Sequence, residues 1–246
     1  RDLHSFPTRR SSDLAAIDAE SDTDLTARGF EFNTIVVGAA QPANGFAPRA
    51  STGAAFNGSL VVNDLDHPQS IRWTPEGEPF AFPGAYVAWL DTGDRDEVTK
   101  LLTLGGALGA YLKRAIFRIN WLPLSEDIQQ TRAIDLVATG LGAVSPQAVT
   151  DFTPPIGPLH AFVHRTGVYA TDLTPDGIVD MTAHVDLTAM LEGGDVADAC
   201  LVNNIDEQRL ELWGAGRGWF IHYDRAHWND GQPAITGPQI RSGPPT

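Results

Sequence analysis

Hydrophobic residues along this chain fall into short runs, and the runs are separated by turns rich in glycine, proline, aspartate and asparagine. Short runs of this kind, several of them alternating with polar residues, predict β-strands. Strands are expected at 30–37, 60–63, 70–74, 86–90, 98–104, 108–112, 115–119, 133–138, 159–163, 168–171, 178–185, 199–203, 209–213 and 218–224. A short helical signal occurs at 186–191, and residues 15–27 are expected to be a short helix or a frayed end, so the chain is expected to be mostly β.

One hydrophobic pattern returns along the chain. Residues 108–118, LGAYLKRAIFR, align without a gap with residues 159–169, LHAFVHRTGVY, and each copy reads as a strand, a basic turn and a second strand. Looser copies occupy 58–73 and 199–213. Strand-and-turn repeats of roughly 40 to 50 residues are typical of propeller blades, which cannot bury their faces without neighbours. The expected fold is all-β, a β-propeller or propeller arc of about four visible antiparallel blades, with one short helix.

The repeats divide the chain into regions. Residues 1–14, RDLHSFPTRRSSDL, resemble the translation of a sequencing-library adapter, so they are interpreted as an artefact and the natural N-terminus is expected to be missing. Residues 15–55 are expected to form an N-terminal strand and loop region, and residues 56–230 the blades. Residues 231–246 contain too few apolar residues to fold alone and are expected to be a flexible tail.

The charge balance restricts the partners. A formal net charge of −14 disfavours binding to duplex DNA or to anionic membranes. No apolar run approaches the roughly 18 residues that a membrane-spanning helix needs. The single cysteine, Cys200, lies in the apolar run ACLV, which excludes a disulfide framework and predicts a small buried side chain.

Histidines are the first candidates for a metal site. His160 and His164 are four residues apart on one expected strand, which places them on the same face but roughly 13 Å apart, too far to share one ion. His184 or His222 could meet one of them across strands, but no helical His pair, cysteine pair or His-carboxylate cluster accompanies them. No metal site and no cofactor are therefore predicted.

Paired acids are the second candidates. Glycosidases use two carboxylates about 5 to 10 Å apart. Grouped acids occur at Asp64 and Asp66, at Asp94, Asp96 and Glu97, and at Asp172 and Asp176. All of them lie in turn-like segments, where aspartate ordinarily bonds to its own backbone, so a turn role is favoured over catalysis. No catalytic residue is assigned.

Aromatic and glycine-rich patterns complete the candidates. Tryptophans lie mostly at the ends of expected strands, at Trp73, Trp89, Trp121, Trp213, Trp219 and Trp228. They suit packing at blade edges, with a sugar-binding platform as the alternative. The segment GGALGA near Gly105 lies between strands rather than before a helix, so it is not expected to cradle a phosphate.

The order of the segments carries a resemblance to a known family. It rests on residues 67–119, on GLGAVSPQAV (140–149), on HAFVHRTGVYATD (160–172), on VDLTAML (185–191) and on RLELWGAGRGWFIHYDRAHW (209–228). In this order they resemble the segments of bacteriophage tail-nozzle proteins, the tail tubular protein B-like virion proteins with a β-propeller core. The chain departs from them in lacking their N-terminal part.

The resemblance implies a non-catalytic structural component of a phage virion, of the tail nozzle, tail tube or stopper type, which lines or caps the DNA exit channel. Its implied partners are further copies in a ring and other tail or portal proteins, with DNA passing through without specific binding. The alternatives are a glycan-binding or glycan-hydrolysing propeller and a secreted interaction scaffold. A glycan-active protein should gather acids or tryptophans around one pocket, whereas a tail protein should carry apolar patches on its flanks.

Overall fold

The computed structural model describes residues 47–84, 86–90, 92–93, 96–121, 132–185, 187, 198–214, 216–229 and 232–240. Within these ranges the regular structure is β-strand, apart from one 3-10 turn, η1 (Pro146–Ala148). Residues 15–27, the expected strand at 30–37 and all but one residue of the expected helix at 186–191 lie outside the described residues.

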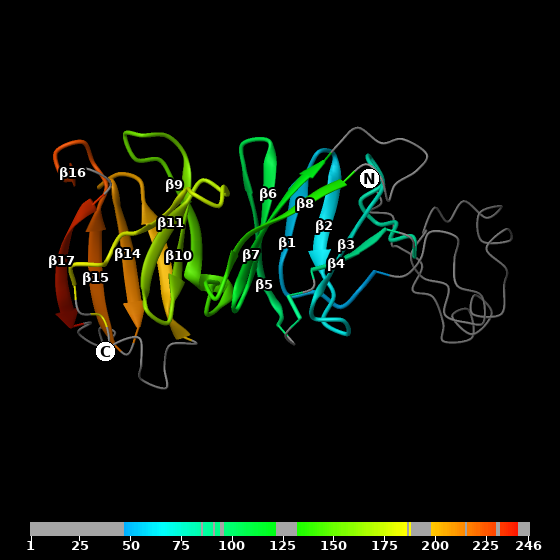
Figure 1. Cartoon of the computed structure of the whole chain (residues 1–246), viewed down its shortest axis with the longest axis horizontal. Helices are drawn as coiled ribbons and strands as arrows, with labels where there is room; N and C mark the ends of the chain where they lie inside the picture. The colour runs from blue at the N-terminus through cyan, green and yellow to red at the C-terminus, as the bar shows by residue number, and fades with distance from the viewer. Residues whose placement is uncertain are drawn as a thin grey trace, which may run out of the picture.

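The strands form four antiparallel sheets that follow one another in chain order (Figure 1). Sheet 1 contains β1 (Gly53–Phe56), β2 (Ser59–Asn63), β3 (Ser70–Trp73) and β4 (Val87–Trp89). Sheet 2 contains β5 (Val98–Leu104), β6 (Ala107–Leu112), β7 (Ala115–Trp121) and β8 (Arg132–Thr139). Sheet 3 contains β9 (Val149–Phe152), β10 (Leu159–His164), β11 (Gly167–Thr171) and β12 (Ile178–Asp180). Sheet 4 contains β13 (Cys200–Asn204), β14 (Arg209–Gly214), β15 (Arg217–His222), β16 (Trp228–Asn229) and β17 (Gln232–Ile240).

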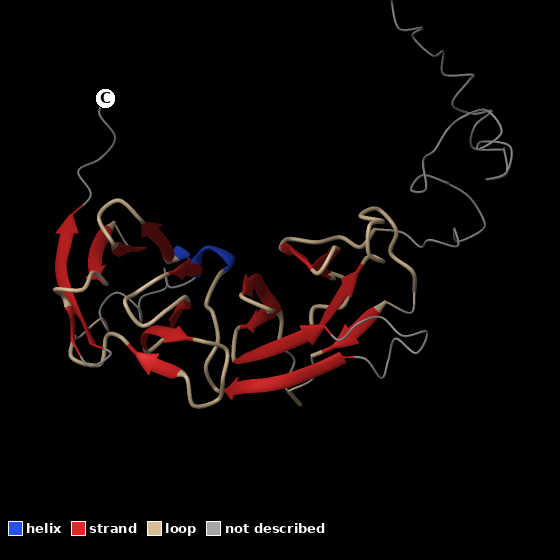
Figure 2. Ribbon diagram, turned by 90° about the horizontal axis from the view of Figure 1, so that it is seen from above, coloured by secondary structure: helices blue, strands red, loops and turns tan. Residues whose placement is uncertain are grey.

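The sheets lie along a curved arc, seen from above in Figure 2. Within sheets 1 to 3 the strands pair in chain order, each with the next. The first strands of successive sheets lie against one another: β5 contacts both β1 and β9, and β9 contacts β13. The all-β prediction is thus confirmed, and four successive antiparallel sheets are the arrangement expected of propeller blades.

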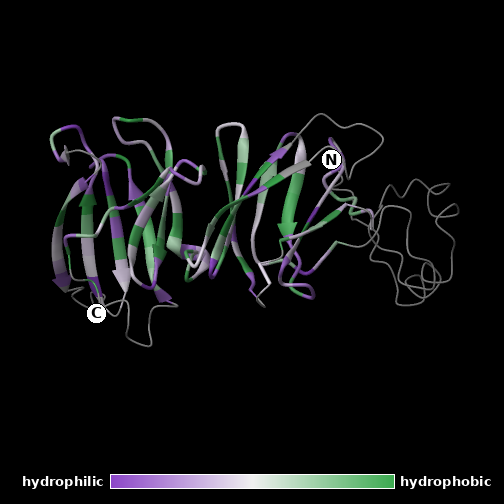
Figure 3. Ribbon diagram, viewed as in Figure 1, coloured by the Kyte–Doolittle hydropathy of each residue, from purple (hydrophilic) through white to green (hydrophobic). Residues whose placement is uncertain are grey.

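Hydrophobic side chains fill the three spaces between successive sheets. The strands accordingly carry much of the hydrophobic colour in Figure 3. In β6, Leu108, Ala110 and Leu112 pack toward sheet 1, while Tyr111 packs toward sheet 3. Side chains of a strand alternate between the two faces of its sheet, so a sheet covered on both sides needs apolar residues at every position. Every residue of β6 is accordingly buried.

The repeat predicted from the sequence corresponds to the hairpin between the second and third strands of each sheet. Its two best copies are β6 with β7 and β10 with β11, and the looser copy at 58–73 is β2 with β3. The copy at 199–213 is shifted by one strand, because it corresponds to β13 and β14, the first and second strands of sheet 4. The matching hairpin is β14 with β15. Hydrophobic alternation is alike in all strands of a meander, so it does not show which hairpin is which.

The region after Trp228 differs from the prediction. Residues 232–240, expected within a flexible tail, form β17, whose residues from Ala234 to Ile240 pair with β15. The segment has few apolar residues because it is a strand next to an edge, and the ladder with β15 supplies its backbone hydrogen bonds.

Further differences concern single elements. Strands β1, which begins sheet 1 at Gly53, β9 and β16 form where no strand was expected. The strand expected at 178–185 ends at Asp180, because the Asp180 carboxylate accepts hydrogen bonds from the backbone and hydroxyl of Thr182 and turns the chain. Cys200 is only partly buried, since it lies on the face of β13 opposite the buried Leu201.

One buried polar pair joins sheets 2 and 3. The Nε2 atom of His160 lies 3.0 Å from the Thr103 carbonyl oxygen, and its Nδ1 atom lies 3.0 Å from the Tyr111 hydroxyl. A carbonyl only accepts, so Nε2 donates, and the neutral ring accepts the Tyr111 proton at Nδ1. Burial lowers the pKa of His160, more than the Thr103 carbonyl and the charge of Asp151 raise it, and so favours this neutral form.

Replacing Tyr111 by phenylalanine should therefore destabilise the fold. The change leaves His160 Nδ1 buried without its donor, which costs about 1–3 kcal/mol of unfolding free energy. Tyr169→Phe is the matched control, because the Tyr169 hydroxyl bonds to an exposed partner, Thr166 Oγ1, at 2.7 Å and should cost well under that amount. Denaturant unfolding followed by fluorescence measures both, and equal losses in the two variants would contradict the account.

Candidate functional site

The turns that follow the second strands bring charged and polar side chains together along one rim of the arc. The turn of sheet 1, residues 64–69, and the turn of sheet 3, at Arg165 and Thr166, flank the Lys113 and Arg114 turn of sheet 2. Two pockets lie between these turns, and Asp96 lines both of them. The basic dipeptide that is repeated in the sequence lies on this rim. Both copies, Lys113-Arg114 and His164-Arg165, line the same pocket.

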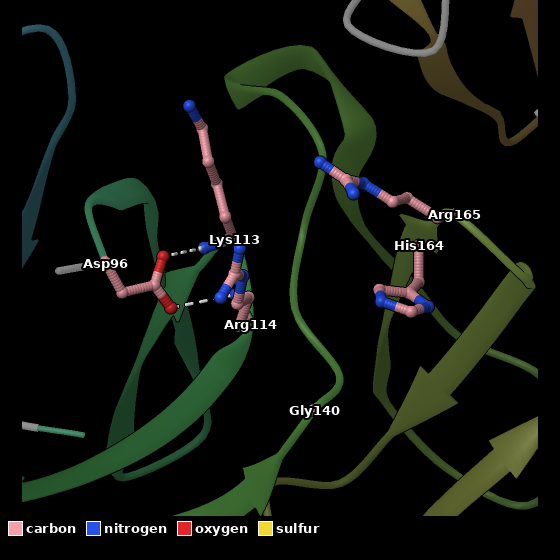
Figure 4. A pocket seen from close by; sticks show the side chains of 6 residues that line it. All are labelled: Asp96, Lys113, Arg114, Gly140, His164 and Arg165. Carbon is pink, nitrogen blue, oxygen red and sulfur yellow. Dashed lines mark hydrogen bonds between the residues drawn. The ribbon is translucent and has the colours of Figure 1, made fainter. Parts of the chain in front are cut away.

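The pocket between sheets 2 and 3, here called the basic pocket, has a volume of about 470 Å³. Figure 4 shows the Arg165 side chain extending from the β10–β11 turn toward the side of the pocket formed by sheet 2. The lining residues are Asp96, Lys113, Arg114, Gly140, His164 and Arg165.

Asp96 holds the sheet 2 side of the basic pocket. Its side chain is buried, at 6% exposure, and accepts hydrogen bonds from three backbone N–H groups. The donors are Glu97 at 2.9 Å, Lys113 at 3.1 Å and Arg114 at 2.9 Å, the last two drawn in Figure 4. The carboxylate therefore fixes the hairpin turn, as the turn role predicted for it requires. Asp94, its neighbour in the predicted acidic group, lies outside the described residues.

The connection from β8 to β9 fixes the two sides of the pocket relative to each other. The Ala143 N–H donates to the Leu112 carbonyl of sheet 2 at 2.8 Å, and the next N–H, of Val144, donates to the Val163 carbonyl of sheet 3 at 3.1 Å. Gly142 permits this approach: a Cβ atom there would overlap the Leu112 carbonyl oxygen and lie 2.6 Å from the Lys113 carbonyl carbon. The strand ends that carry the basic turns are thus tied together by backbone.

His164 is the half-buried member of the basic pocket. Burial lowers its pKa, and the nearby charge of Arg165 lowers it further. Its Nδ1 atom accepts a hydrogen bond from the Thr166 hydroxyl at 2.9 Å, and that hydroxyl also bonds to Tyr169. These hydrogen bonds within the turn orient the His164 ring, and the lowered pKa favours its neutral form.

The second pocket lies at the rim, where the 64–69 turn and the end of β4 in sheet 1 meet residues 96 and 97 before β5. It contains an exposed tryptophan and is here called the tryptophan pocket. Its volume is about 360 Å³. The Trp89 side chain is 58% exposed and meets the His67 ring edge to face, with 5.5 Å between centroids. The lining residues are Asp66, His67, Pro68, Gln69, Trp89, Asp96 and Glu97.

The histidines singled out in the sequence are dispersed. His160 and His164 lie on the same face of β10, as predicted, but His160 is buried against Tyr111. His222 meets His227 on sheet 4, at 5.3 Å between ring centroids, and His184 bonds to Gln232. Among the described residues, no three His, Cys, Asp or Glu side chains are grouped so as to hold a metal ion.

The remaining predicted acids have local roles. Asp64 accepts a hydrogen bond from the Asp66 backbone at 3.0 Å and lies 3.2 Å from His67 Nδ1. Asp172 accepts both the backbone N–H and the hydroxyl of Thr174. These contacts confirm the predicted turn role of Asp64 and Asp172.

The tryptophans divide into buried and exposed examples. Trp73 and Trp219 pack between sheets, at 2% and 7% exposure. Trp89, at the end of β4, is the exception noted above, and the Trp121 side chain lies outside the described ones. Sequence reasoning did not bring Trp89 together with Asp66 and Glu97, because the three come from two sheets. The signal available was the position of each acid in a turn between two expected strands.

Comparison with known proteins adds no family. No family model matches the chain, and no curated protein matches it at a significant level. In the part of the chain that the structure describes, no helix is long and apolar enough to cross a membrane.

The close approach at Gly142 generates a prediction. Gly142→Ala should destabilise the chain by about 1–3 kcal/mol, because the added methyl meets backbone atoms that must shift. Gly106→Ala is the control, since a Cβ atom there has no neighbour within 4 Å. Thermal unfolding of both variants measures the effect. A Gly142→Ala protein as stable as the control would show that the connection does not approach the turn this closely.

Proposed function

We propose that this chain is a non-catalytic structural component of a phage virion, of the tail nozzle, tail tube or stopper type, built as an arc of four propeller blades. The virion role rests on the resemblance of residues 60–228 to such proteins. The observation that carries the structural role is the contrast between the inner and the outer sheets. Sheets 2 and 3 are covered on both faces, whereas hydrophobic clusters join sheet 1 and sheet 4 to one neighbour each among the described residues.

The outer face of sheet 1 supports association with a further copy. Trp73 and Ile71 of β3 face sheet 2, and in β4 the same is true of Ala88. Because successive side chains of a strand point to opposite faces of the sheet, Val87 and Trp89 lie on the outer face, where Trp89 is 58% exposed. Exposed tryptophan is typical of the residues that dominate protein interfaces.

The outer face of sheet 4 has a different character. Val202 is 46% exposed there, and the Arg209 guanidinium lies 4.2 Å from the centre of the Phe220 ring. Glu211 accepts hydrogen bonds from Arg209 at 2.9 Å and from Trp213 at 3.3 Å. Aromatic and arginine side chains together are frequent at interfaces. Because the two outer faces differ, copies would join head to tail, and such contacts close into rings when the rotation permits.

The charge balance supports the same role. The chain carries 31 acidic against 17 basic residues, apart from histidine. A channel through which DNA moves should not hold phosphates, and negatively charged walls repel them.

The association is tested by a charge placed on the outer face. Trp89→Glu should weaken self-association by roughly 30-fold, as expected when a tryptophan worth about 2 kcal/mol at an interface is lost. Sedimentation velocity across a range of concentrations measures this, and electron microscopy of the wild-type particles shows whether they are rings.

Ile156→Glu is the matched control, because Ile156 is 64% exposed in the loop between β9 and β10, away from both outer faces. A wild-type chain that stays monomeric at every concentration would contradict the proposal. An equal effect of the two substitutions would show that the outer face of sheet 1 is not the contact.

A second candidate function, glycan recognition, is favoured by the tryptophan pocket. An exposed indole face beside Asp66 and Gln69 offers a stacking surface with polar groups next to it. The Asp66 carboxylate pairs with Arg49 at 3.3 Å, and both side chains are largely exposed, so a sugar hydroxyl can compete for it.

Glycan recognition predicts that Trp89→Ala abolishes binding on a glycan array, while Trp213→Ala, on the outer face of sheet 4, retains it. The measurement is made with monomeric protein, so that loss of self-association does not lower the apparent affinity. Absence of binding by the wild-type chain would remove this candidate and leave the structural role untouched.

A further inference from the structure

The basic pocket concentrates positive charge on a chain whose formal net charge is −14. Lys113 and Arg114 come from the turn of sheet 2, and Arg165 comes from the turn of sheet 3. Among the described residues, Asp96 is the one carboxylate that lines the pocket, and its oxygens already accept three backbone N–H groups. Like charges from two sheets are thus held around one hollow, and both oxygens of Asp96 are occupied by backbone donors.

We propose that the basic pocket is a binding site for a phosphate-type oxyanion, a doubly charged tetrahedral group held between the turns of sheets 2 and 3. The Arg165 guanidinium presents several N–H donors in a planar fork that matches two oxygens of such a group, and the Lys113 ammonium adds a second positively charged donor. The site is independent of the self-association proposed above, because neither outer face contributes to it.

The pocket is held open before any ligand arrives. Asp96 fixes the Lys113 turn through its backbone, and the residues after Gly142 tie Leu112 to Val163. A ligand therefore meets cationic side chains whose turns are already fixed by the backbone, and the cost of ordering them is reduced.

The ion pair that Lys113 makes is weak. The Lys113 ammonium group pairs with Glu97, and both side chains are about half exposed, at 49% and 50%. Exposed pairs contribute at most about 1 kcal/mol, so an incoming dianion can replace Glu97 as the partner of Lys113. Glu97 lines the tryptophan pocket rather than the basic pocket.

The size of the pocket suits a single phosphate group rather than a nucleic acid duplex. A volume of about 470 Å³ accommodates one phosphate or a small phosphate ester. The overall negative charge of the chain opposes the extended contact that a nucleic acid duplex makes along its backbone.

Titration calorimetry of the full chain with inorganic phosphate and with glycerol phosphate tests the site. Arg165→Ala and Lys113→Ala should each weaken binding roughly tenfold, because each removes a charge-assisted hydrogen bond. Arg225→Ala is the control, since it removes the same charge from an exposed turn of sheet 4, outside the pocket. Thermal unfolding of each variant confirms that it is folded.

The two ligands distinguish the source of the group. Binding of inorganic phosphate identifies a free ion as sufficient, and binding of the ester alone identifies a phosphate presented by a larger molecule; either result supports the site. No binding of either ligand at millimolar concentration would overturn the proposal. Equal weakening by Arg225→Ala and Arg165→Ala would also overturn it, because the effect would then be one of overall charge.

Discussion

The structure depends on the burial of each sheet face against the next sheet. A four-stranded antiparallel sheet has two faces, and in this chain the faces of sheets 2 and 3 are buried on both sides. Strand β6 shows the consequence within six residues, where Ala110 faces sheet 1 and Tyr111 faces sheet 3. Since each sheet contacts its neighbours along the chain, stability is shared between sheets and their interfaces, as in repeat proteins.

The same stacking creates the rim sites. Once the sheets are aligned by their cores, the equivalent turns of neighbouring sheets lie beside one another. Short backbone connections then set the spacing, most directly where Gly142 passes the Lys113 turn. The basic pocket and the tryptophan pocket are both gaps between successive turns, and they differ because the residues placed in those turns differ. The repeated sheets therefore place different side chains at equivalent positions along the rim.

Much of the fold follows from the hydrophobic pattern. The β5 strand was predicted with its observed bounds, and the hairpin of β6 and β7 was recognised through the repeat, because strands covered on both faces leave a continuous apolar run. The edge strands β1, β9 and β16 were missed, as was β17 next to an edge, since such strands with polar and small residues resemble loops in sequence. The basic dipeptides could be noticed from the sequence. The sequence could not show that both dipeptides line one pocket. That depends on how sheets 2 and 3 are placed against each other, and the two dipeptides are 51 residues apart in the chain.

The most direct test of the account is amide hydrogen exchange on the full chain, resolved by peptide. If each sheet is stabilised by its neighbours, amides of β6 and β10, in the sheets covered on both faces, should exchange most slowly, and amides of β4, at the edge of sheet 1, should exchange much faster. Exchange in β6 and β10 as fast as in β4 would contradict the stacked arrangement on which the arc, its outer faces and its rim pockets all depend.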